Sequence, residues 1–182
     1  MIPRHERLDE FGFETWDENA FPLAYLLTFR TFGTWLHGDE RTSVKRDGWN
    51  VYGRNRIAPN DRMERWMSEE MKQAPFILSE TMRPIVEAAV RDLCLRRGFG
   101  LGAVNVRTNH VHAVVSAAQK PERVVDALKA NATKFLRDAC MVARETRVWS
   151  RGRSRRYLWK PRHVHAAIEY TVNGQGDFVM PD

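Results

Sequence analysis

The first half of the chain alternates between strand-like and helix-like hydrophobic patterns. Residues 23–30 (Leu-Ala-Tyr-Leu-Leu-Thr-Phe-Arg) are β-rich and almost continuously apolar, which is typical of a central strand. Between Thr81, a suitable helix cap, and Gly98, a suitable stop, apolar residues recur at helical spacing. Residues 99–106 and 110–116 then predict two strands joined by a hairpin turn. The pattern of this half is therefore strand, helix, strand, strand.

The second half adds another helix, a short strand and a last helix. Pro121 begins a helix whose apolar side is expected to exclude Lys129 and Lys134. Residues 155–159 predict a short strand, and Pro161 begins the last helix. The order β-α-β-β-α-β-α predicts an α+β fold. We expect a ferredoxin-like split β-α-β antiparallel sheet with helices on one face and an added C-terminal helix.

Two stretches lack a clear period. Residues 1–21 mix charges with Phe11, Phe13 and Trp16, and we interpret them as an arm packed on the domain. Residues 35–80 form an insertion rich in aromatic and arginine residues, with a short helix expected near 61–72 that Asn60 or Asp61 would cap. The insertion is either a lid or DNA-recognition loop or, the interpretation we favour slightly, a cover for the sheet. The whole chain, 1–182, is predicted to be one domain.

Composition places the protein among soluble globular proteins, with 43% hydrophobic and 29% charged residues. No apolar run approaches the roughly 18 residues that cross a bilayer, and the first residues do not form a signal peptide. These features predict a cytoplasmic protein with no membrane partner. Cys94 and Cys140 lie in apolar helical patterns without partners at metal-ligand spacing, and we expect both to be free and buried.

Positive charge is concentrated in one segment. The net charge is +6, and residues 144–162 hold eight basic residues against one acidic residue, interleaved with Trp149, Tyr157 and Trp159. Such a mixture suits a phosphate backbone and unstacked bases. An ordinary solvated surface rich in arginine remains the alternative.

A histidine pair lies on one of the predicted hairpin strands. In Asn109-His110-Val111-His112 the two imidazoles are at i and i+2, so a strand places them on the same face. Two convergent imidazoles are the beginning of a divalent-metal site, although structural histidines with satisfied hydrogen bonds are the alternative. His163 and His165 are also at i and i+2, but on a helix they diverge by about 200° and cannot bind one ion.

These elements together resemble the IS200-like transposase family, including the REP-associated tyrosine transposases. The likeness covers about residues 22–176 and rests on the Asn109-His110-Val111-His112 motif, a helix with Lys129, a basic segment with the strand Tyr157-Leu158-Trp159, and a helix with Tyr170. It implies a metal-dependent single-strand DNA endonuclease and strand transferase of the HUH type, which carries out DNA transposition through a 5′-phosphotyrosine intermediate.

The resemblance also implies roles for individual residues. Tyr170 matches the family's nucleophile, with Tyr157 as a rival, and the C-terminal helix would carry it to the sheet. His110 and His112 would bind Mg²⁺ or Mn²⁺ with a third ligand from Gln175 or Asn173, of which Gln175 is favoured because it matches the family's glutamine in type. The residues expected to contact DNA are Arg107, Lys129, Arg151, Arg153, Arg155, Arg156 and Trp159.

The implied partner is single-stranded DNA, with hairpin-containing element ends as the expected substrate. The protein would then associate with the nucleoid when bound, and the resemblance allows a homodimer. Two other functions stay open from the sequence. One is a domesticated protein that binds hairpin DNA without cleaving it, and the other is a metal-dependent phosphoesterase that acts on a small substrate without the tyrosine.

Overall fold

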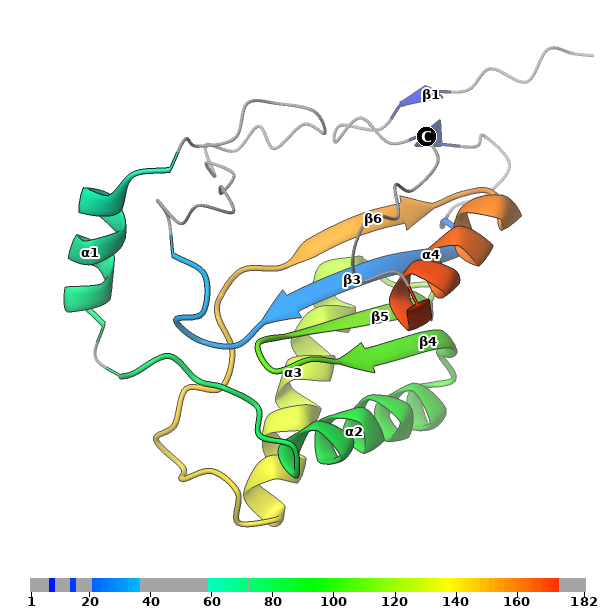
Figure 1. The fold of residues 1–182 in the computed structure, drawn as a ribbon. Coiled ribbons are helices and arrows are strands. Elements are labelled where there is room, and N and C mark those ends of the chain that lie inside the picture. The colour runs from blue at the N-terminus through cyan, green and yellow to red at the C-terminus, as the bar shows by residue number, and fades with distance from the viewer. Residues whose placement is uncertain (1–6, 9–13, 16–20, 37–58, 72, 174–182) are drawn as a thin grey trace, which may run out of the picture.

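A four-stranded antiparallel sheet lies at the centre of the computed structural model, which describes residues 7–8, 14–15, 21–36, 59–71 and 73–173 (Figure 1). The elements of this sheet and its helices follow the predicted order. They are β3 (Ala24–Arg30), α2 (Met82–Arg97), β4 (Gly100–Val106), β5 (His110–Ser116), α3 (Pro121–Asp138), β6 (Ser154–Leu158) and α4 (Pro161–Asn173).

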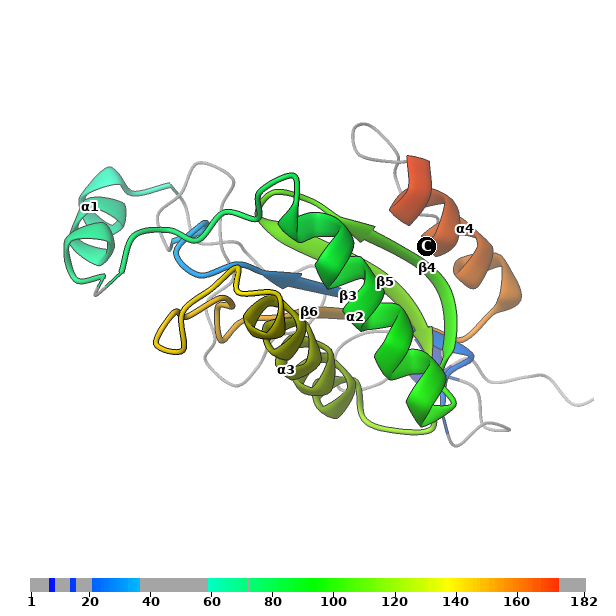
Figure 2. The same cartoon turned by 90° about the horizontal axis from the view of Figure 1, so that it is seen from below.

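The strands are arranged β4-β5-β3-β6, and each pairs with its neighbour in the antiparallel sense. This arrangement is that of the split β-α-β fold, so the predicted fold class is confirmed. Helices α2 and α3 cover one face of the sheet, and α4 lies on the other (Figure 2). Helix α4 is the added C-terminal helix that the sequence predicted.

The larger hydrophobic core lies between the sheet and helices α2 and α3. Side chains that alternate along β3 enter it, and the helices contribute apolar residues with no exposed surface. Its members include Tyr25, Leu27, Phe29, Val86, Ala89, Val90, Val111, Val115, Val124, Val125, Leu128 and Leu136. A smaller core under α4 consists of Ala24, Leu26, Ala103, Val114, Leu158 and Ala167.

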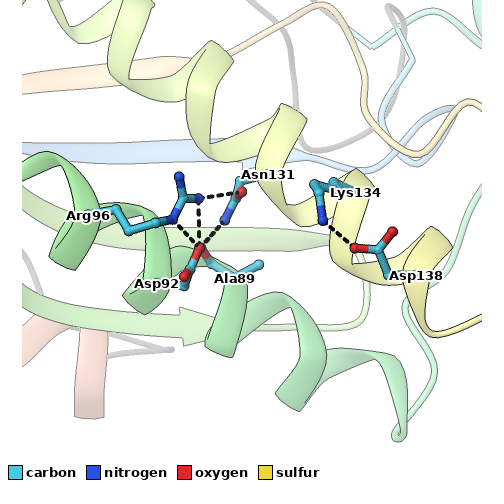
Figure 3. A network of polar contacts seen from close by, with 6 residues as sticks. All are labelled: Ala89, Asp92, Arg96, Asn131, Lys134 and Asp138. Carbon is cyan, nitrogen blue, oxygen red and sulfur yellow. Dashed lines mark hydrogen bonds and ion pairs between the residues drawn. The ribbon is translucent and has the colours of Figure 1, made fainter.

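A polar cluster joins α2 to α3 at the surface of this layer (Figure 3). The Nδ2 atom of Asn131 donates to the carbonyl of Ala89 at 2.7 Å and to the Asp92 carboxylate at 3.1 Å, and its Oδ1 accepts from Arg96 at 2.9 Å. Asn131 is only 9% exposed, so these partners compensate for the loss of water around its amide. Lys134 and Asp138 form a separate ion pair one turn apart on α3.

In α2 and α3, two sequence predictions are confirmed, the end of α2 at Gly98 and the burial of Cys94, and two others are corrected. Gly98 ends α2 with φ +64, as predicted. Ser79, not Thr81, caps the start of α2, because the Ser79 Oγ accepts the Met82 N–H at 3.2 Å whereas Thr81 makes no cap bond. Cys94 is buried, but Cys140 is exposed and adopts φ +55 two residues after the end of α3. Its left-handed backbone turns the chain outward, so the helical apolar pattern does not extend to this residue.

The insertion contains the short helix that was expected. Helix α1 (Asp61–Glu69) begins after Asn60, whose side chain accepts the Met63 N–H at 3.0 Å. No α1 residue is buried, Trp66 is 61% exposed, and Figures 1 and 2 show α1 standing away from the sheet. Helix α1 therefore does not cover the sheet, whereas Leu78, near the end of the insertion, belongs to the larger core. Residues 37–58 of the insertion lie outside the described residues, so its predicted role as a cover for the sheet stays a prediction.

The described part of the N-terminal arm consists of two short strands. Arg7–Leu8 (β1) and Glu14–Thr15 (β2) pair in the antiparallel sense. The predicted packing of Phe11, Phe13 and Trp16 lies outside the described residues. In the described part of the chain, no helix has both the length and the hydropathy that a bilayer span requires.

Candidate functional site

Polar side chains gather on the α4 face of the sheet, in two rows that cross neighbouring strands. Residues directly opposite one another in antiparallel strands share a face. In the first row, Arg30 on β3 pairs opposite His110 on β5, and the N–H of Arg107 donates to the His110 carbonyl from the other side at 2.8 Å. In the second row, His112 lies between Thr28 and Asn105.

The two histidines face each other closely. Their ring centroids are 4.7 Å apart with the planes at 79°, so the rings lie on one face, as the i, i+2 spacing predicted. Each ring is oriented through its Nδ1 atom, which hydrogen bonds to Asn109 Oδ1 at 2.6 Å in His110 and to Thr28 Oγ1 at 2.8 Å in His112. Fixing Nδ1 in this way is how proteins orient the Nε2 atom of a metal-binding histidine.

The His112 ring is in its neutral form at pH 7. It is 7% exposed, and this burial, together with the nearby charges of His110, Arg30 and Arg107, lowers its pKa to about 4. An imidazole must be deprotonated to bind a metal ion. The surroundings of His112 therefore keep it in the form that a cation requires.

Tyr170 approaches this pair from α4. Its ring centroid lies 5.5 Å from that of His112 at 77°. One residue on, the Thr171 carbonyl accepts a hydrogen bond from Asn105 Nδ2 at 2.8 Å, which fixes this end of the helix to β4 beside His112. The expected proximity of the tyrosine and the histidines is therefore present.

A glycine lets α4 lie this close to the sheet. Leu101 pairs with Val115 and Ala103 with Val114, so Gly102 is the additional residue of a β-bulge. A Cβ atom at Gly102 would lie 3.1 Å from Cδ1 of Ile168 on α4. Any larger residue would push against the helix that carries Tyr170.

His110 and His112 are the two expected metal ligands that the structure describes fully, and the expected third ligand is only partly described. Gln175, the favoured third ligand, lies outside the described residues, and Asn173 is the exposed last residue of α4. The described ranges contain no group of three or more His, Cys, Asp or Glu side chains that could hold a metal. Two imidazoles nevertheless fit a divalent cation whose other positions take an amide, water or phosphate oxygens.

The second histidine pair behaves as predicted. His163 on α4 is buried at 7% exposure, whereas His165 is exposed. The two rings therefore point to different sides of the helix and do not converge on one ion.

The basic segment divides between the two faces of the sheet. Arg153 donates to the Asp126 carboxylate of α3 at 2.9 Å, and Arg155 lies 2.8 Å from the Glu122 carboxylate. These two guanidinium groups are therefore on the α3 side and are paired with acidic residues. Arg156 instead pairs opposite Leu26 on the α4 face, and Arg151 is exposed before β6.

Two residues expected to contact DNA are buried. Lys129 is 8% exposed, so it lies on the buried side of α3, contrary to the sequence prediction. Its Nζ donates to the carbonyls of Ser150 and Gly152 at 2.9 and 2.8 Å. Trp159 is 9% exposed and stacks on Tyr157 with ring centroids 6.3 Å apart. Neither an amine held by carbonyls nor a buried ring is presented to a nucleic acid, so we leave both out of the proposed DNA surface.

The rival nucleophile lies away from the histidines. Tyr157 packs edge-on against Tyr25 with ring centroids 5.3 Å apart. Tyr25 belongs to the core under α2 and α3, on the opposite face of the sheet from His110 and His112. Of the two candidate nucleophiles, Tyr157 and Tyr170, only Tyr170 therefore lies near the histidine pair.

Three residues of the site were not singled out from the sequence. Thr28 orients the His112 ring, and Asn105 holds the end of α4. Arg30 lies opposite His110, and its guanidinium carbon is 3.0 Å from the centroid of the Trp35 ring. Their positions depend on the register between strands that are far apart in the sequence. The only signal was that Thr28 and Arg30 alternate at the polar end of an otherwise apolar strand.

Comparisons with known proteins found a matching family and a similar solved structure. A family model described as IS200-like transposase matches residues 70–168, which include the histidine pair and most of α4. A crystal structure of a Deinococcus radiodurans R1 protein, provisionally described as a transposase, is similar at a TM-score of 0.46 with 15% sequence identity, over 88% of this chain and 96% of that one. The curated proteins contain no match.

Proposed function

The chain belongs to the IS200-like transposase family, and from this premise we propose that it is a metal-dependent single-strand DNA endonuclease and strand transferase with Tyr170 as nucleophile. The observation that carries the proposal is the meeting of Tyr170 with His112, at 5.5 Å between ring centroids. Three elements that are far apart in the sequence, β3, β5 and α4, supply the groups around that contact.

The proposed chemistry is a transesterification. The Tyr170 phenol loses its proton as its oxygen attacks phosphorus, the new O–P bond replaces the P–O3′ bond, and the departing 3′ oxygen takes up a proton. The products are a 5′-phosphotyrosine and a free 3′-hydroxyl. Since one ester replaces another, a 3′-hydroxyl of a different strand can reverse the step and join to the DNA without ATP.

A divalent cation would be held by His110 and His112, with Gln175 or Asn173 as the third ligand. When bound, Mg²⁺ or Mn²⁺ stabilises charge on the phosphate and favours the phenolate over a phenol whose ordinary pKa is near 10. The neutral state of His112 and the hydrogen bonds at both Nδ1 atoms support this role. Because imidazole ligands bind Mn²⁺ more tightly than Mg²⁺, Mn²⁺ should act at lower concentration.

Single-stranded DNA would cross the α4 face, where Arg107 and Arg156 would meet phosphates, and the exposed Arg151 before β6 would add a further contact. Arg153 and Arg155 would contribute less, since their charges are already paired with carboxylates. Hairpin-containing DNA ends and a homodimer belong to the same proposal, as the family resemblance implies them.

The deciding experiment is a covalent-adduct assay. The protein is incubated with single-stranded oligonucleotides and Mn²⁺ or Mg²⁺, and denaturing gels are used to detect protein joined to DNA. Tyr170→Phe should eliminate adduct and cleavage together while the melting temperature and DNA affinity stay nearly unchanged, because the ring that packs between α4 and the sheet is kept. Tyr157→Phe is the matched control and should leave the adduct intact.

Each other result points to a different function. A nucleotide-modified peptide that contains Tyr157 would overturn the assignment of Tyr170. Cleavage without an adduct would favour a metal-activated water and hence a phosphoesterase. Binding of hairpin DNA with no cleavage under either ion would indicate a domesticated binding protein.

A salt titration tests the DNA surface. Replacing both Arg151 and Arg156 by glutamine should reduce the slope of log affinity against log salt by about 0.7 for each lost phosphate contact. The double variant of Arg153 and Arg155 should change the slope less. Equal slopes for the unmodified protein and the Arg151 and Arg156 variant would make the segment an ordinary solvated surface.

A further inference from the structure

We infer that Arg30 and Arg107 form a clamp for the scissile phosphate, one on each side of His110. The inference rests on the proposed function. It adds Arg30 to the groups that would contact DNA, and it assigns Arg107, already proposed to meet a phosphate, to the phosphate that reacts. It also assigns a catalytic role to Arg30, which the sequence pattern did not single out.

The strand register places the two arginines symmetrically. Arg30 lies opposite His110 from β3, and the N–H of Arg107, just after β4, donates to the His110 carbonyl from the other side. Neighbouring strands are about 4.8 Å apart, so the two backbones are separated by roughly 10 Å. Two long side chains that start at that distance can converge on one phosphate above the histidine between them.

Both arginines lie close enough to His112 for their charges to act on it. Both Arg30 and Arg107 are among the groups that lower the pKa of His112, in the neighbouring row. The site therefore holds two permanent cations before any metal ion binds. A phosphodiester, which is an anion with oxygen acceptors in the fork geometry that arginine matches, is the ligand that suits this arrangement.

Each arginine is prepared in a different way. The Arg30 guanidinium carbon lies 3.0 Å from the centroid of the Trp35 ring, a stacked arrangement that restrains the plane of the fork. The Nε atom of Arg107 is buried and has no hydrogen-bond partner within the described residues. An unpaired buried donor is costly, and a phosphate oxygen would pair it.

Other arginines of the chain show what a structural role looks like. Arg91 and Arg96 on α2 each bind a carboxylate one turn away, and Arg153 and Arg155 bind carboxylates of α3. The described carboxylates form no ion pair of this kind with Arg107. In this respect Arg107 differs from those four arginines, which hold helices and strands together.

Arginines in these positions would act mainly on the rate of cleavage. When the Tyr170 oxygen adds to phosphorus, negative charge grows on the non-bridging oxygens, and donors already in place stabilise that charge without rearrangement. The expected loss from removing one donor of this kind is about 10²-fold or more in rate. Lysine keeps the charge but lacks the fork, so it should restore only part of the rate.

The test uses the oligonucleotide in which the unmodified protein forms its adduct, at saturating concentration in single-turnover conditions. Arg30→Gln and Arg107→Gln should each slow cleavage by about 10²-fold or more, and Arg30→Lys and Arg107→Lys should lie between. Arg91→Gln, which removes the same charge on the far side of α2, is the matched control and should cleave normally. Melting temperatures and Mn²⁺ binding of the variants are measured beside the rates.

A modified substrate locates the contact. A methylphosphonate at the cleaved position removes one charged non-bridging oxygen, so the rate difference between unmodified protein and the Gln variants should shrink to a few-fold there. The same replacement one nucleotide away should leave the full difference. Arg30 and Arg107 are changed in separate variants. If one variant fails to fold, the cleavage rate of the other variant still tests the clamp.

The outcomes separate this inference from the proposed function. An active protein whose folded Gln variants cleave as fast as Arg91→Gln overturns the clamp and leaves the tyrosine mechanism intact. A defect seen only in DNA affinity, or one that persists on the methylphosphonate, also overturns it. An unmodified protein that forms no adduct overturns the proposed function and the clamp with it.

Discussion

The two faces of the central sheet differ in what covers them. The face under α2 and α3 is apolar along the whole length of β3, from Tyr25 to Phe29. The face under α4 is apolar only at one end, around Leu26 and Val114, and becomes polar where the helix ends and His112 begins. A single helix of 13 residues covers the apolar part and leaves the histidine rows next to its last turn.

This difference separates stability from chemistry within one strand. Alternate residues of β3 and β5 point to a closed core or to the proposed site, so one short sequence serves both. Changes on the α2 and α3 face should therefore alter folding, and changes at the polar end of the α4 face should alter cleavage. The following experiments test that division, beginning with the largest expected effect.

The strongest test is to remove a proposed metal ligand. His110→Ala or His112→Ala should abolish cleavage while most DNA affinity remains, because arginine contacts to phosphates do not depend on the ion. Cleavage is measured on single-stranded oligonucleotides, and affinity is measured by titration in the same buffer. If both variants still cut the DNA, the metal site is not at these histidines.

The opposite face should respond in the opposite way. Leu128→Ala, at a position with no exposed surface on α3, should lower the free energy of unfolding by about 2–5 kcal/mol. The cleavage rate per folded molecule should not change. Leu95→Ala on α2, where the side chain is 84% exposed, is the matched control and should stay within about 0.5 kcal/mol. A slowed reaction in folded Leu128→Ala protein would break the division between the faces.

Acid should act on the polar face through His112. Its pKa is about 4 in the folded protein and about 6.5 in the unfolded chain. The unfolded chain therefore binds more protons between these values, and the free energy of unfolding should fall as the pH decreases from 6.5 to 4. Denaturant titrations without metal measure this loss, and His112→Gln should show less of it. The same slope in both proteins would assign the effect to other groups.

The smallest effect is expected at the end of α3. Cys140 occupies the left-handed position where its N–H reaches the Arg137 carbonyl at 2.9 Å and the next N–H reaches Leu136 at 2.9 Å. Cys140→Gly should stabilise the protein by about 1 kcal/mol, because glycine adopts this backbone without a steric cost. Gly98→Ala, at the equivalent end of α2, should destabilise it. Thermal melts measure both, and neither change should alter cleavage.

The sequence predicted the elements and the histidine pair because these depend on local patterns. The strand at 110–116 and the helix ends at Pro121 and Gly98 follow from period, turn residues and caps within a few positions. The shared face of His110 and His112 follows from the pleat of one strand.

The errors concern burial by the rest of the fold, which a local pattern does not show. Lys129 has a polar side chain that suggests a surface, yet its amine is held by two carbonyls of the loop before β6. Trp159 is also buried, with one face stacked on Tyr157. The place of Arg30 beside His110 depends on the register of β3 against β5, which no local pattern contains.

The bulge at Gly102 has a consequence for how this protein can diverge. A side chain at residue 102 would meet Ile168 on α4. Residues 102 and 168 therefore help to set the distance between Tyr170 and the histidines, although neither contacts DNA or metal in the proposed site. Inherited changes at residue 102 would move the nucleophile relative to the histidines, and a smaller residue at 168 would move it back. Descendants with different substrate geometries are therefore expected to carry paired substitutions at 102 and 168, while the reacting groups stay the same.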